Sequence, residues 1–420
     1  MRTPVPDYLA EVADACAPST GGELASYIPE LTRVDPRYFG LAMATVDGSI
    51  YSVGDAEVEF TMQSISKAFV YGLALRDRGM RAVLEKVDVE PSGDPFDGLS
   101  FEASTGRPRN PMINAGAITA HTLVGKEGID ADERFDLIHR LLCDLAGREL
   151  RVDDEVWQSE VRTSDRNLAI AHMLRSKGVI TDPAEEVISA YARQCAVLVT
   201  ARDLAVMAAT LANGGVQPVT GKRVFSGAQV RQLLSVMLTC GMYDSAGDWV
   251  SAVGIPAKSG VGGGILGALP SQLGIATFSP RLDAHGNSVR GIQTFERLTA
   301  DMRLHLMEVA PPARSVVHAV RVVGEGEDAV RVFELSGLLG FTAAERVLQW
   351  LSADPPPERI VVVDLTEVHH IEDVARRMLL EGMRRMRLDG HVVHVVDSGD
   401  VLPDPDPGDG VMLGPPPMAI

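Results

Sequence analysis

The sequence has few residues of the kinds that cross-link chains or span membranes. Its 420 residues include only four cysteines, at Cys16, Cys143, Cys195 and Cys240, with no CxxC pair and no zinc-finger spacing. Such sparse cysteines indicate free, mostly buried thiols in a reducing compartment. No apolar run reaches the roughly 18 residues that a transmembrane helix needs, and the acidic N-terminal stretch lacks the apolar core of a signal peptide. We therefore expect a soluble, cytoplasmic protein with no membrane partner.

Positive charge is also scarce. Lysine and arginine number 39 against 57 acidic residues, which gives a net charge of -18 and a pI of about 5.0. Binding to phosphate backbones or anionic membrane surfaces requires a basic patch, so this balance argues against nucleic acid as the main partner. Aromatic residues make up only 5%, but hydrophobic residues reach 45%. That content is enough for a buried core in each of the two or three domains that the length suggests.

The order of predicted elements indicates an α+β fold in the first 305 or so residues. Residues 38–55 predict a hairpin around Asp47-Gly48, and Ser64 to Arg78 predict a helix that ends at Gly79. More helices follow, including one over 133–147 and one that opens with a Thr200–Asp203 capping box. Short strands are then predicted over 263–270, 272–280 and 288–295. Such an order favours one antiparallel sheet shared by the first and last strands, with helices packed against it.

A second pattern begins after a predicted linker around Pro311-Pro312. Strands over 330–337, 359–366 and 391–397 alternate with helices over 342–353 and 371–390, which predicts a small α/β domain. We place the domains at 1–308 and 315–397, and expect the Pro-, Gly- and Asp-rich tail over 398–420 to be disordered. Four histidines, at His369, His370, His391 and His394, are interpreted as strand-end side chains, so no metal is expected.

Ser64 and Lys67 form an S-x-x-K motif in the apolar stretch "QSISKAF". Three residues apart on a helix, both side chains face one way. A serine hydroxyl becomes a good nucleophile when a base removes its proton. A lysine can be that base if burial or a second cation lowers its pKa from about 10.4. The alternative is a surface lysine on an amphipathic helix.

Lys258 stands in "AKSGVGGG", a Lys-Ser-Gly triplet followed by a glycine run and a predicted strand. Glycines allow a ligand to approach the backbone closely. In folds that pair S-x-x-K with K-[ST]-G, this strand edge lines the nucleophile. Lys258 could then supply the second cation beside Lys67. The alternative is an exposed lysine in a glycine-rich loop.

Other polar residues are candidates for holding a ligand. Asn114, in "NPMINAGAI", is either a turn residue or an amide donor to a polar ligand. Glu160 and Asn167 lie seven residues apart, which places them on one face if the segment is a single helix. Their carboxylate and amide could hold an ammonium and a carboxylate group. Tyr191 and Tyr243 belong to a small set of tyrosines and could equally be core residues.

Seven motifs taken together resemble the motif series of the serine-dependent glutaminases. They run in order as "GGELASYIPEL", "QSISKAF", "NPMINAGAI", Glu160-x6-Asn167, "YARQC", "GMYDSAG" and "AKSGVGGG", and the resemblance covers about residues 8–305. It implies a β-lactamase/transpeptidase-like domain, an antiparallel sheet plus a helical subdomain. It also implies cofactor-free hydrolysis of L-glutamine to L-glutamate and ammonia by a homodimer or homotetramer.

The resemblance assigns roles by matching position. Ser64 would be the nucleophile, Lys67 its base and Tyr243 a proton relay, with the backbone N–H groups of Ser64 and Val261 as the oxyanion hole. Glu160 suits the α-ammonium group of glutamine, and neutral amides suit its carboxylate. The implied substrate-binding residues are Tyr27, Gln63, Ser64, Asn114, Glu160, Asn167, Tyr191, Tyr243 and Val261.

The C-terminal domain resembles a STAS domain in "VVVDLTEVHHIEDVARRML". That family often has a phosphorylatable serine where this sequence has Asp373, which argues against a phosphorylation switch. A carboxylate near a helix N-terminus is stabilising in itself. The resemblance implies a regulatory module with a protein or nucleotide partner, or a dimerisation aid.

Two further hypotheses stay open at this point. A penicillin-interacting serine enzyme would share the Ser–Lys and Lys-Ser-Gly elements, and "SDRN" resembles its S-D-N motif. Those enzymes act outside the cytoplasm, and "NPMINAGAI" has no role in them. Alternatively, the chain is a non-enzymatic STAS-type interaction protein, against which the intact catalytic set argues.

Overall fold

The hairpin predicted around Asp47-Gly48 forms and lies at one edge of a five-stranded antiparallel sheet. The computed structural model describes residues 5–92, 100–308, 316–326, 329–339, 343–344, 347–348, 351, 356–408 and 410–416. The chain divides into two units, Met1–Glu308 and Val309–Ile420. The predicted linker and most of the helix predicted over 342–353 lie outside the described residues.

The sheet of the first unit joins the two ends of that unit. Its order is β2-β1-β7-β6-β5, so β1 from the start of the chain pairs with β7 from the end, as the sequence predicted. The strands are β1 (Gly40–Thr45), β2 (Ile50–Gly54), β5 (Ala257–Gly260), β6 (Gly264–Leu269) and β7 (Leu273–Phe278).

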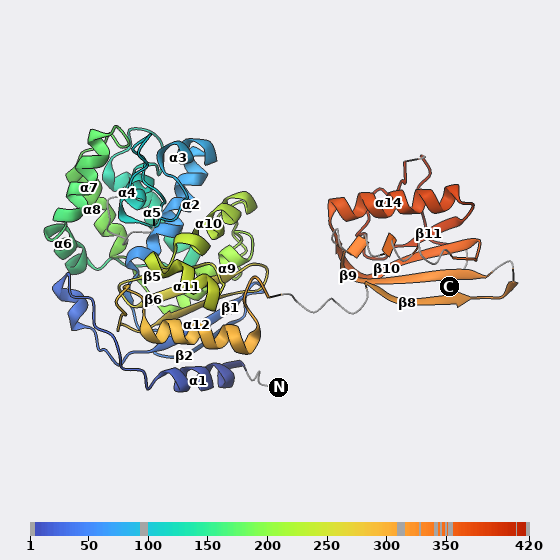
Figure 1. Cartoon of the computed structure of the whole chain (residues 1–420), viewed down its shortest axis with the longest axis horizontal. Coiled ribbons are helices and arrows are strands. Elements are labelled where there is room, and N and C mark those ends of the chain that lie inside the picture. Colours follow the sequence, from blue (N-terminus) through green and yellow to red (C-terminus); the bar gives the residue numbers. More distant parts are fainter. Residues whose placement is uncertain are drawn as a thin grey trace. The chain divides into compact units, whose positions relative to one another are not determined.

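Each face of this sheet is covered by helices (Figure 1). Leu41 and Met43 of β1 point to the face packed by α1 (Val5–Cys16), α11 (Ala246–Ala252) and α12 (Val289–Met302). The alternate residues, Ala42 and Ala44, belong to the core that includes α9 (Ala201–Ala212). Helix α9 lies so close to β7 that a β-carbon on Gly274 would stand 2.2 Å from Ala209 N. Only glycine fits there, which fixes the helix against the sheet.

The strand predicted over 288–295 is wrong, because these residues begin α12. Ser288 caps the helix by accepting a hydrogen bond from Gly291 N. The buried residues Gly291, Thr294, Phe295 and Leu298 follow a helical spacing that a short apolar run does not distinguish from a strand.

The remaining helices of the first unit form a helical subdomain beside the sheet (Figure 1). The predicted capping box of Thr200 and Asp203 and the Gly147 helix end are confirmed. A two-stranded sheet joins β3 (Phe60–Thr61) to β4 (Leu198–Val199). The helices are α2 (Ser66–Arg78), α3 (Met80–Lys86), α4 (Asn114–Thr122), α5 (Ala131–Ala146), α6 (Asp154–Arg162), α7 (Asp165–Ser176), α8 (Ala184–Cys195) and α10 (Gly227–Cys240), with 3-10 turns η1 (Pro29–Arg33), η2 (Gln63–Ile65) and η3 (Tyr243–Ser245).

The second unit is a four-stranded mixed sheet with helix α14 (Asp373–Leu388). Its order is β11-β10-β9-β8, in which β10 runs parallel to both neighbours and β8 antiparallel to β9. The strands are β8 (Val317–Val323), β9 (Val330–Leu339), β10 (Ile360–Ile371) and β11 (Val392–Val396).

The expectation of a wholly disordered tail over 398–420 is wrong for its described part. Leu402 and Leu413 are buried in the core of the second unit. Val395 N on β11 donates to Gly414 O at 3.0 Å. Two leucines among the prolines and glycines are enough to hold the segment against the sheet, because each removes apolar surface from water.

The cysteines are free thiols, as predicted, with Cys143 partly buried and the other three buried. Among the described residues, no helix has the length and apolar character needed to cross a membrane.

Candidate active site

Ser64 lies in η2, a 3-10 turn that leads directly into α2. The α-helix therefore begins two residues later than predicted, at Ser66. Lys67, in its first turn, is 1% exposed, so the surface-lysine interpretation is wrong. Its Nζ donates to Asn114 Oδ1 at 2.5 Å and to Met112 O at 3.3 Å. These two bonds hold the amine inside the protein, on the side where α4 begins.

Lys258 on β5 is the second buried amine, with no exposed surface, so the exposed-loop interpretation is also wrong. Its Nζ donates to Gly241 O at 3.0 Å and Ser259 O at 2.7 Å. Burial, and next the positive charge of Lys67, hold the pKa of Lys258 well below its ordinary value. The two amines therefore interact, as the sequence analysis suggested for this pair.

Tyr243 lies between Lys258 and Ser64. Its ring centroid is 4.2 Å from Lys258 Nζ, and its hydroxyl donates to Ser259 O at 3.2 Å. Burial raises the pKa of Tyr243 far above its ordinary value, and hydrogen bonds with Ser64 and Ser259 offset part of that rise. The hydroxyl of Tyr243 is thus protonated at neutral pH and in hydrogen-bonding contact with Ser64.

Two residues beside Ser64 hold left-handed backbone conformations that side chains disfavour. Gln63 has φ +48° and Tyr243 has φ +56°. Each such conformation costs about 1–3 kcal/mol and persists only where surrounding contacts enforce it, a pattern that concentrates at functional sites.

The turn carrying Ser64 approaches β5 at a glycine. A β-carbon on Gly260 would lie 2.8 Å from Met62 O and 3.1 Å from a side-chain carbon of Ile65. The glycine of the Lys-Ser-Gly triplet therefore permits η2 to lie directly against the strand end that continues into Val261. This contact brings the backbones of Ser64 and Val261 to the same end of the sheet.

Glu160 is a buried carboxylate with an unsatisfied oxygen. It is 9% exposed, and its Oε2 has no hydrogen-bond partner among the described residues. Burial raises the pKa of Glu160 to about 7, opposed by a hydrogen bond from Gln63 and by the charge of Lys67. A buried acceptor of this kind is costly unless a ligand completes it, and an ammonium group would do so.

Glu160 and Asn167 would share one face only if their segment were a single helix, and it is not. Helix α6 ends at Arg162 and α7 begins at Asp165. Both residues nevertheless reach the site, because Asn167 Oδ1 accepts from Asn114 Nδ2 at 3.0 Å and Glu160 interacts with Gln63. Asn114 in turn accepts from Lys67, so the amides are linked directly to the buried amine.

Two tyrosines complete the predicted set. Tyr27 is 48% exposed, but its hydroxyl points inward and donates to Gln63 Oε1 at 2.8 Å. Tyr191 on α8 is buried, and its pKa is raised well above the ordinary value by burial and by the nearby Cys195 and Glu160. Tyr27 therefore forms an outer edge of the site and Tyr191 an inner wall.

A buried polar network, not predicted from the sequence, holds the Ser64 turn. Ser66 Oγ donates to Gln63 O at 2.8 Å, and Gln194 Nε2 donates to Ser66 Oγ at 2.9 Å. His121 Nδ1 donates to Gln194 Oε1 at 2.9 Å, and burial lowers the pKa of His121 to about 4. All three side chains are fully buried. The signal available was polar residues inside apolar helices, in "QSISKAF" and "YARQC".

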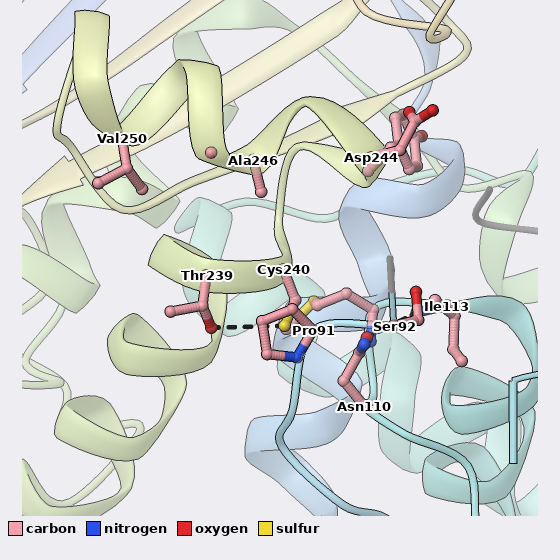
Figure 2. Close-up of a pocket in the computed structure, with 12 residues that line it drawn as sticks. Pro91, Ser92, Asn110, Ile113, Thr239, Cys240, Asp244, Ala246 and Val250 are labelled. Carbon is pink, nitrogen blue, oxygen red and sulfur yellow. Dashed lines mark hydrogen bonds between the residues drawn. The ribbon is translucent and has the colours of Figure 1, made fainter. Parts of the chain in front are cut away.

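Tyr243 also lines a cavity of about 370 Å³. This cavity lies between the chain around Pro91 and Asn110 and the segment from Thr239 to Val250 (Figure 2). Asn110 Oδ1 accepts from Met112 N at 3.0 Å and from Ile113 N at 3.1 Å. It thereby fixes the loop whose Met112 carbonyl receives Lys67. Asn110 is a second positioning residue that the sequence analysis missed.

Known proteins similar to this chain are glutaminases. Residues 22–307 match the glutaminase family. The chain is 47% identical over 410 residues to a glutaminase of Corynebacterium efficiens, covering 98% of this chain and 96% of the relative. A glutaminase of Corynebacterium glutamicum is 48% identical over 404 residues, covering 96% and 97%. The crystal structure of Mglu, 48% identical, superposes with a TM-score of 0.86 and covers 96% of this chain and 100% of that chain.

The mixed α+β arrangement is thus the β-lactamase-like fold of solved glutaminase structures. The chain belongs to the glutaminase family, and its activity is that of a glutaminase, the hydrolysis of glutamine. The family predicted from the motifs is confirmed, and the two alternative hypotheses are contradicted.

Proposed function

We propose that this glutaminase works through a covalent acyl-enzyme formed on Ser64. Lys67 takes the hydroxyl proton as Ser64 Oγ attacks the side-chain amide carbon of L-glutamine. The C–N bond breaks as the leaving nitrogen gains a proton and departs as ammonia. Water then attacks the glutamyl ester, which releases L-glutamate and returns the proton to Ser64. The observation that carries this proposal is the burial of Lys67 beside a second buried amine, Lys258.

The base must be uncharged to accept a proton, and two features favour this in Lys67. Its side chain is 1% exposed, and burial disfavours the charged form of an amine. Lys258 adds a like charge nearby. Two cations in a buried site oppose each other's protonation.

Glu160 opposes this effect in the empty site, because its negative charge favours a protonated Lys67. An α-ammonium group bound to Glu160 would offset that charge. Binding of the substrate therefore removes an electrostatic reason for Lys67 to stay charged, and couples recognition of the α-ammonium group to activation of Ser64.

Tyr243 is suited to transfer a proton to the leaving nitrogen, because its neutral hydroxyl contacts Ser64. The backbone N–H groups of Ser64 and Val261 would donate to the developing oxyanion. One such donor contributes about 2.7–4 kcal/mol to transition-state stabilisation in another serine hydrolase.

The α-end of the substrate would be held by Glu160 and the surrounding amides and phenols. Glu160 would bind the α-ammonium group, and the remaining substrate-binding residues are Tyr27, Gln63, Asn114, Asn167 and Tyr191. Mglu, similar over nearly the whole chain, has been solved in an L-glutamate binding form. With the α-end fixed, asparagine places its amide one methylene short of Ser64, and reacts poorly.

Ammonia release from L-glutamine and L-asparagine, followed between pH 5 and pH 9, tests this function. We expect turnover of glutamine, much slower turnover of asparagine, and a KM for glutamine that falls as pH rises through about 7. The pH effect has this sign because Glu160, with a pKa of about 7, binds the ammonium group only when ionised.

The variant Glu160→Gln separates binding from folding. It should raise KM at pH 8 and also raise Tm, because it removes a buried charge. The cost of that charge grows as pH rises from about 4.5, the ordinary pKa of this group, to about 7, its pKa in the folded protein, and is fully present at pH 8. The exposed Glu127→Gln serves as the matched control, with neither change expected. A KM for glutamine that Glu160→Gln leaves unaltered would remove Glu160 from the ammonium site.

We further propose that the second unit is a STAS-like regulatory module that binds a protein or nucleotide, in an enzyme that is a homodimer or homotetramer. Its mixed sheet with α14 supports this proposal, and Asp373 at the first position of α14 acts as a fixed negative charge at the helix N-terminus. Shorter glutaminases support a separable role. One from Microcystis aeruginosa matches 74% of this chain and 92% of itself, and a probable glutaminase of known structure matches 72% and 99%, with a TM-score of 0.69.

Truncation after Glu308 is expected to retain ammonia release within about threefold, because every proposed site residue precedes this point. Ammonia release from glutamine by the truncated and full-length chains, with circular dichroism of both, checks this. Loss of turnover by a folded truncated chain would show that the second unit contributes to the site itself.

A further inference from the structure

Helix α5 carries a histidine and a cysteine one turn apart. His139 and Cys143 occupy positions i and i+4, so both side chains project from one face. The helix ends at Gly147, whose φ of +74° turns the chain back on itself. Glu149 and Leu150 thereby lie beside the last turns of α5, next to His139 and Cys143.

The three side chains present ligand atoms to one another. His139 Nδ1 lies 3.9 Å from Cys143 Sγ and 4.0 Å from Glu149 Oε1, and one ligand atom from each residue lies within 4.8 Å of the others. Ligand atoms on a tetrahedral zinc ion stand about 3.4–3.6 Å apart, given bonds of about 2.3 Å to sulfur and about 2.1 Å to nitrogen or oxygen. Small side-chain rotations would close the difference, and Glu149, 83% exposed, is free to make one.

Backbone groups already orient two of these side chains as metal ligands are oriented. His139 Nε2 lies 2.8 Å from Leu150 O, which can only accept, so Nε2 carries the proton. Nδ1 is then left with its lone pair available to a metal. Leu150 N donates to Cys143 Sγ at 3.3 Å, a bond that stabilises a thiolate. Outer-shell hydrogen bonds of both kinds support metal ligands in proteins.

We propose that His139 Nδ1, Cys143 Sγ and Glu149 Oε1 bind one Zn²⁺ ion, with a fourth position open to water. Binding releases the thiol proton to solvent, because the thiolate is the ligand. A sulfur and an imidazole nitrogen select a borderline or soft cation over Mg²⁺ or Ca²⁺, which prefer oxygen ligands. Without a metal, the same residues form only a weak thiol–imidazole contact, and the lone pair of His139 Nδ1 faces the Glu149 carboxylate at 4.0 Å.

The zinc ion would act on stability rather than on the reaction, since the proposed mechanism uses no metal. It would join the chain after Gly147 to α5, which packs against α8, the helix that carries Tyr191. A ligand that binds only the folded state raises stability in proportion to the logarithm of its concentration. The site would therefore make the melting temperature depend on zinc.

Cobalt substitution in the full-length chain tests the ligand set directly. After removal of metals with a chelator, one equivalent of Co²⁺ should give a thiolate-to-cobalt charge-transfer band in the near ultraviolet. Competition with a chromophoric chelator should show one Zn²⁺ per chain, and Zn²⁺ should raise Tm. Both Cys143→Ala and His139→Asn should remove the band and weaken Zn²⁺ binding at least about 10-fold.

Two further variants separate the loss of a zinc ligand from misfolding and from binding by other residues. Glu149→Ala changes an exposed side chain and should weaken Zn²⁺ binding in a folded protein. His172→Gln alters an exposed histidine that pairs with Glu185 at 3.7 Å without a thiol, and should leave binding unchanged. The proposal is overturned by the absence of a thiolate band, by full Zn²⁺ affinity in Cys143→Ala, or by full affinity in Glu149→Ala.

Discussion

Replacing Ser64 with alanine is expected to lower kcat for glutamine by about 10⁴-fold or more, because the proposed mechanism forms the acyl-enzyme on the Ser64 hydroxyl. Tyr243 and Lys67 would remain in place but would have no hydroxyl to activate. Glutamine should still bind, since the α-end contacts proposed for Glu160 and the amides do not depend on the hydroxyl of Ser64. Single-turnover ammonia release and glutamine binding by calorimetry measure the two effects separately.

The fold of this variant should be intact, because Ser64 is only partly buried and alanine removes a single oxygen. Ser235→Ala, on the exposed side of α10, is the matched control and should keep full activity. Ammonia release by Ser64→Ala within about tenfold of the unaltered enzyme would assign the nucleophile elsewhere.

The turns and helix ends that were predicted correctly are set by residues close to one another in the sequence. Asp47-Gly48 makes its hairpin because glycine accepts φ +93°, and Thr200 and Asp203 cap α9 by hydrogen bonds three residues apart. Those are local rules that hold before the chain folds. The motifs around Ser64 and Lys258 were recognisable for a related reason, since each is a short stretch with a fixed spacing.

The features that could not be predicted arise from packing between residues that are far apart in the sequence. The break between α6 and α7, at Thr163 and Ser164, separates Glu160 from Asn167, and only packing shows that both still reach one site. The Ser66–Gln194 hydrogen bond joins residues 128 positions apart, so no local pattern contains it. The apolar run in α12 is compatible with a strand or with a helix. Only the folded structure decides between them, because the five strands of the sheet do not include this segment.

The two buried lysines are the feature that ties these observations to chemistry. A single buried lysine with polar partners is compatible with a structural role. Two that interact with each other, Lys67 in the turn after Ser64 and Lys258 beside the Tyr243 ring, are costly to bury unless at least one is uncharged. Such a destabilising arrangement is typical of a functional site, and here the uncharged amine would be the base that activates Ser64.

Replacing Lys67 with methionine is expected to lower kcat by about 10²–10⁴-fold, the usual contribution of a general base. Methionine has a similar length and no charge, so the buried site should accept it. The exposed Lys222→Met is the control, with activity expected to stay unchanged.

Lys258→Met provides the sharper test, because it removes only the second cation. Protonation of Lys67 then becomes easier, so the acid limb of the kcat profile should move to higher pH while kcat at alkaline pH recovers in large part. A merely structural role for Lys258 would lower kcat equally at every pH. A profile that keeps its position on the pH axis in Lys258→Met, in a protein with an unaltered Tm, would rule out electrostatic coupling between the two amines as the means by which Lys67 becomes a base.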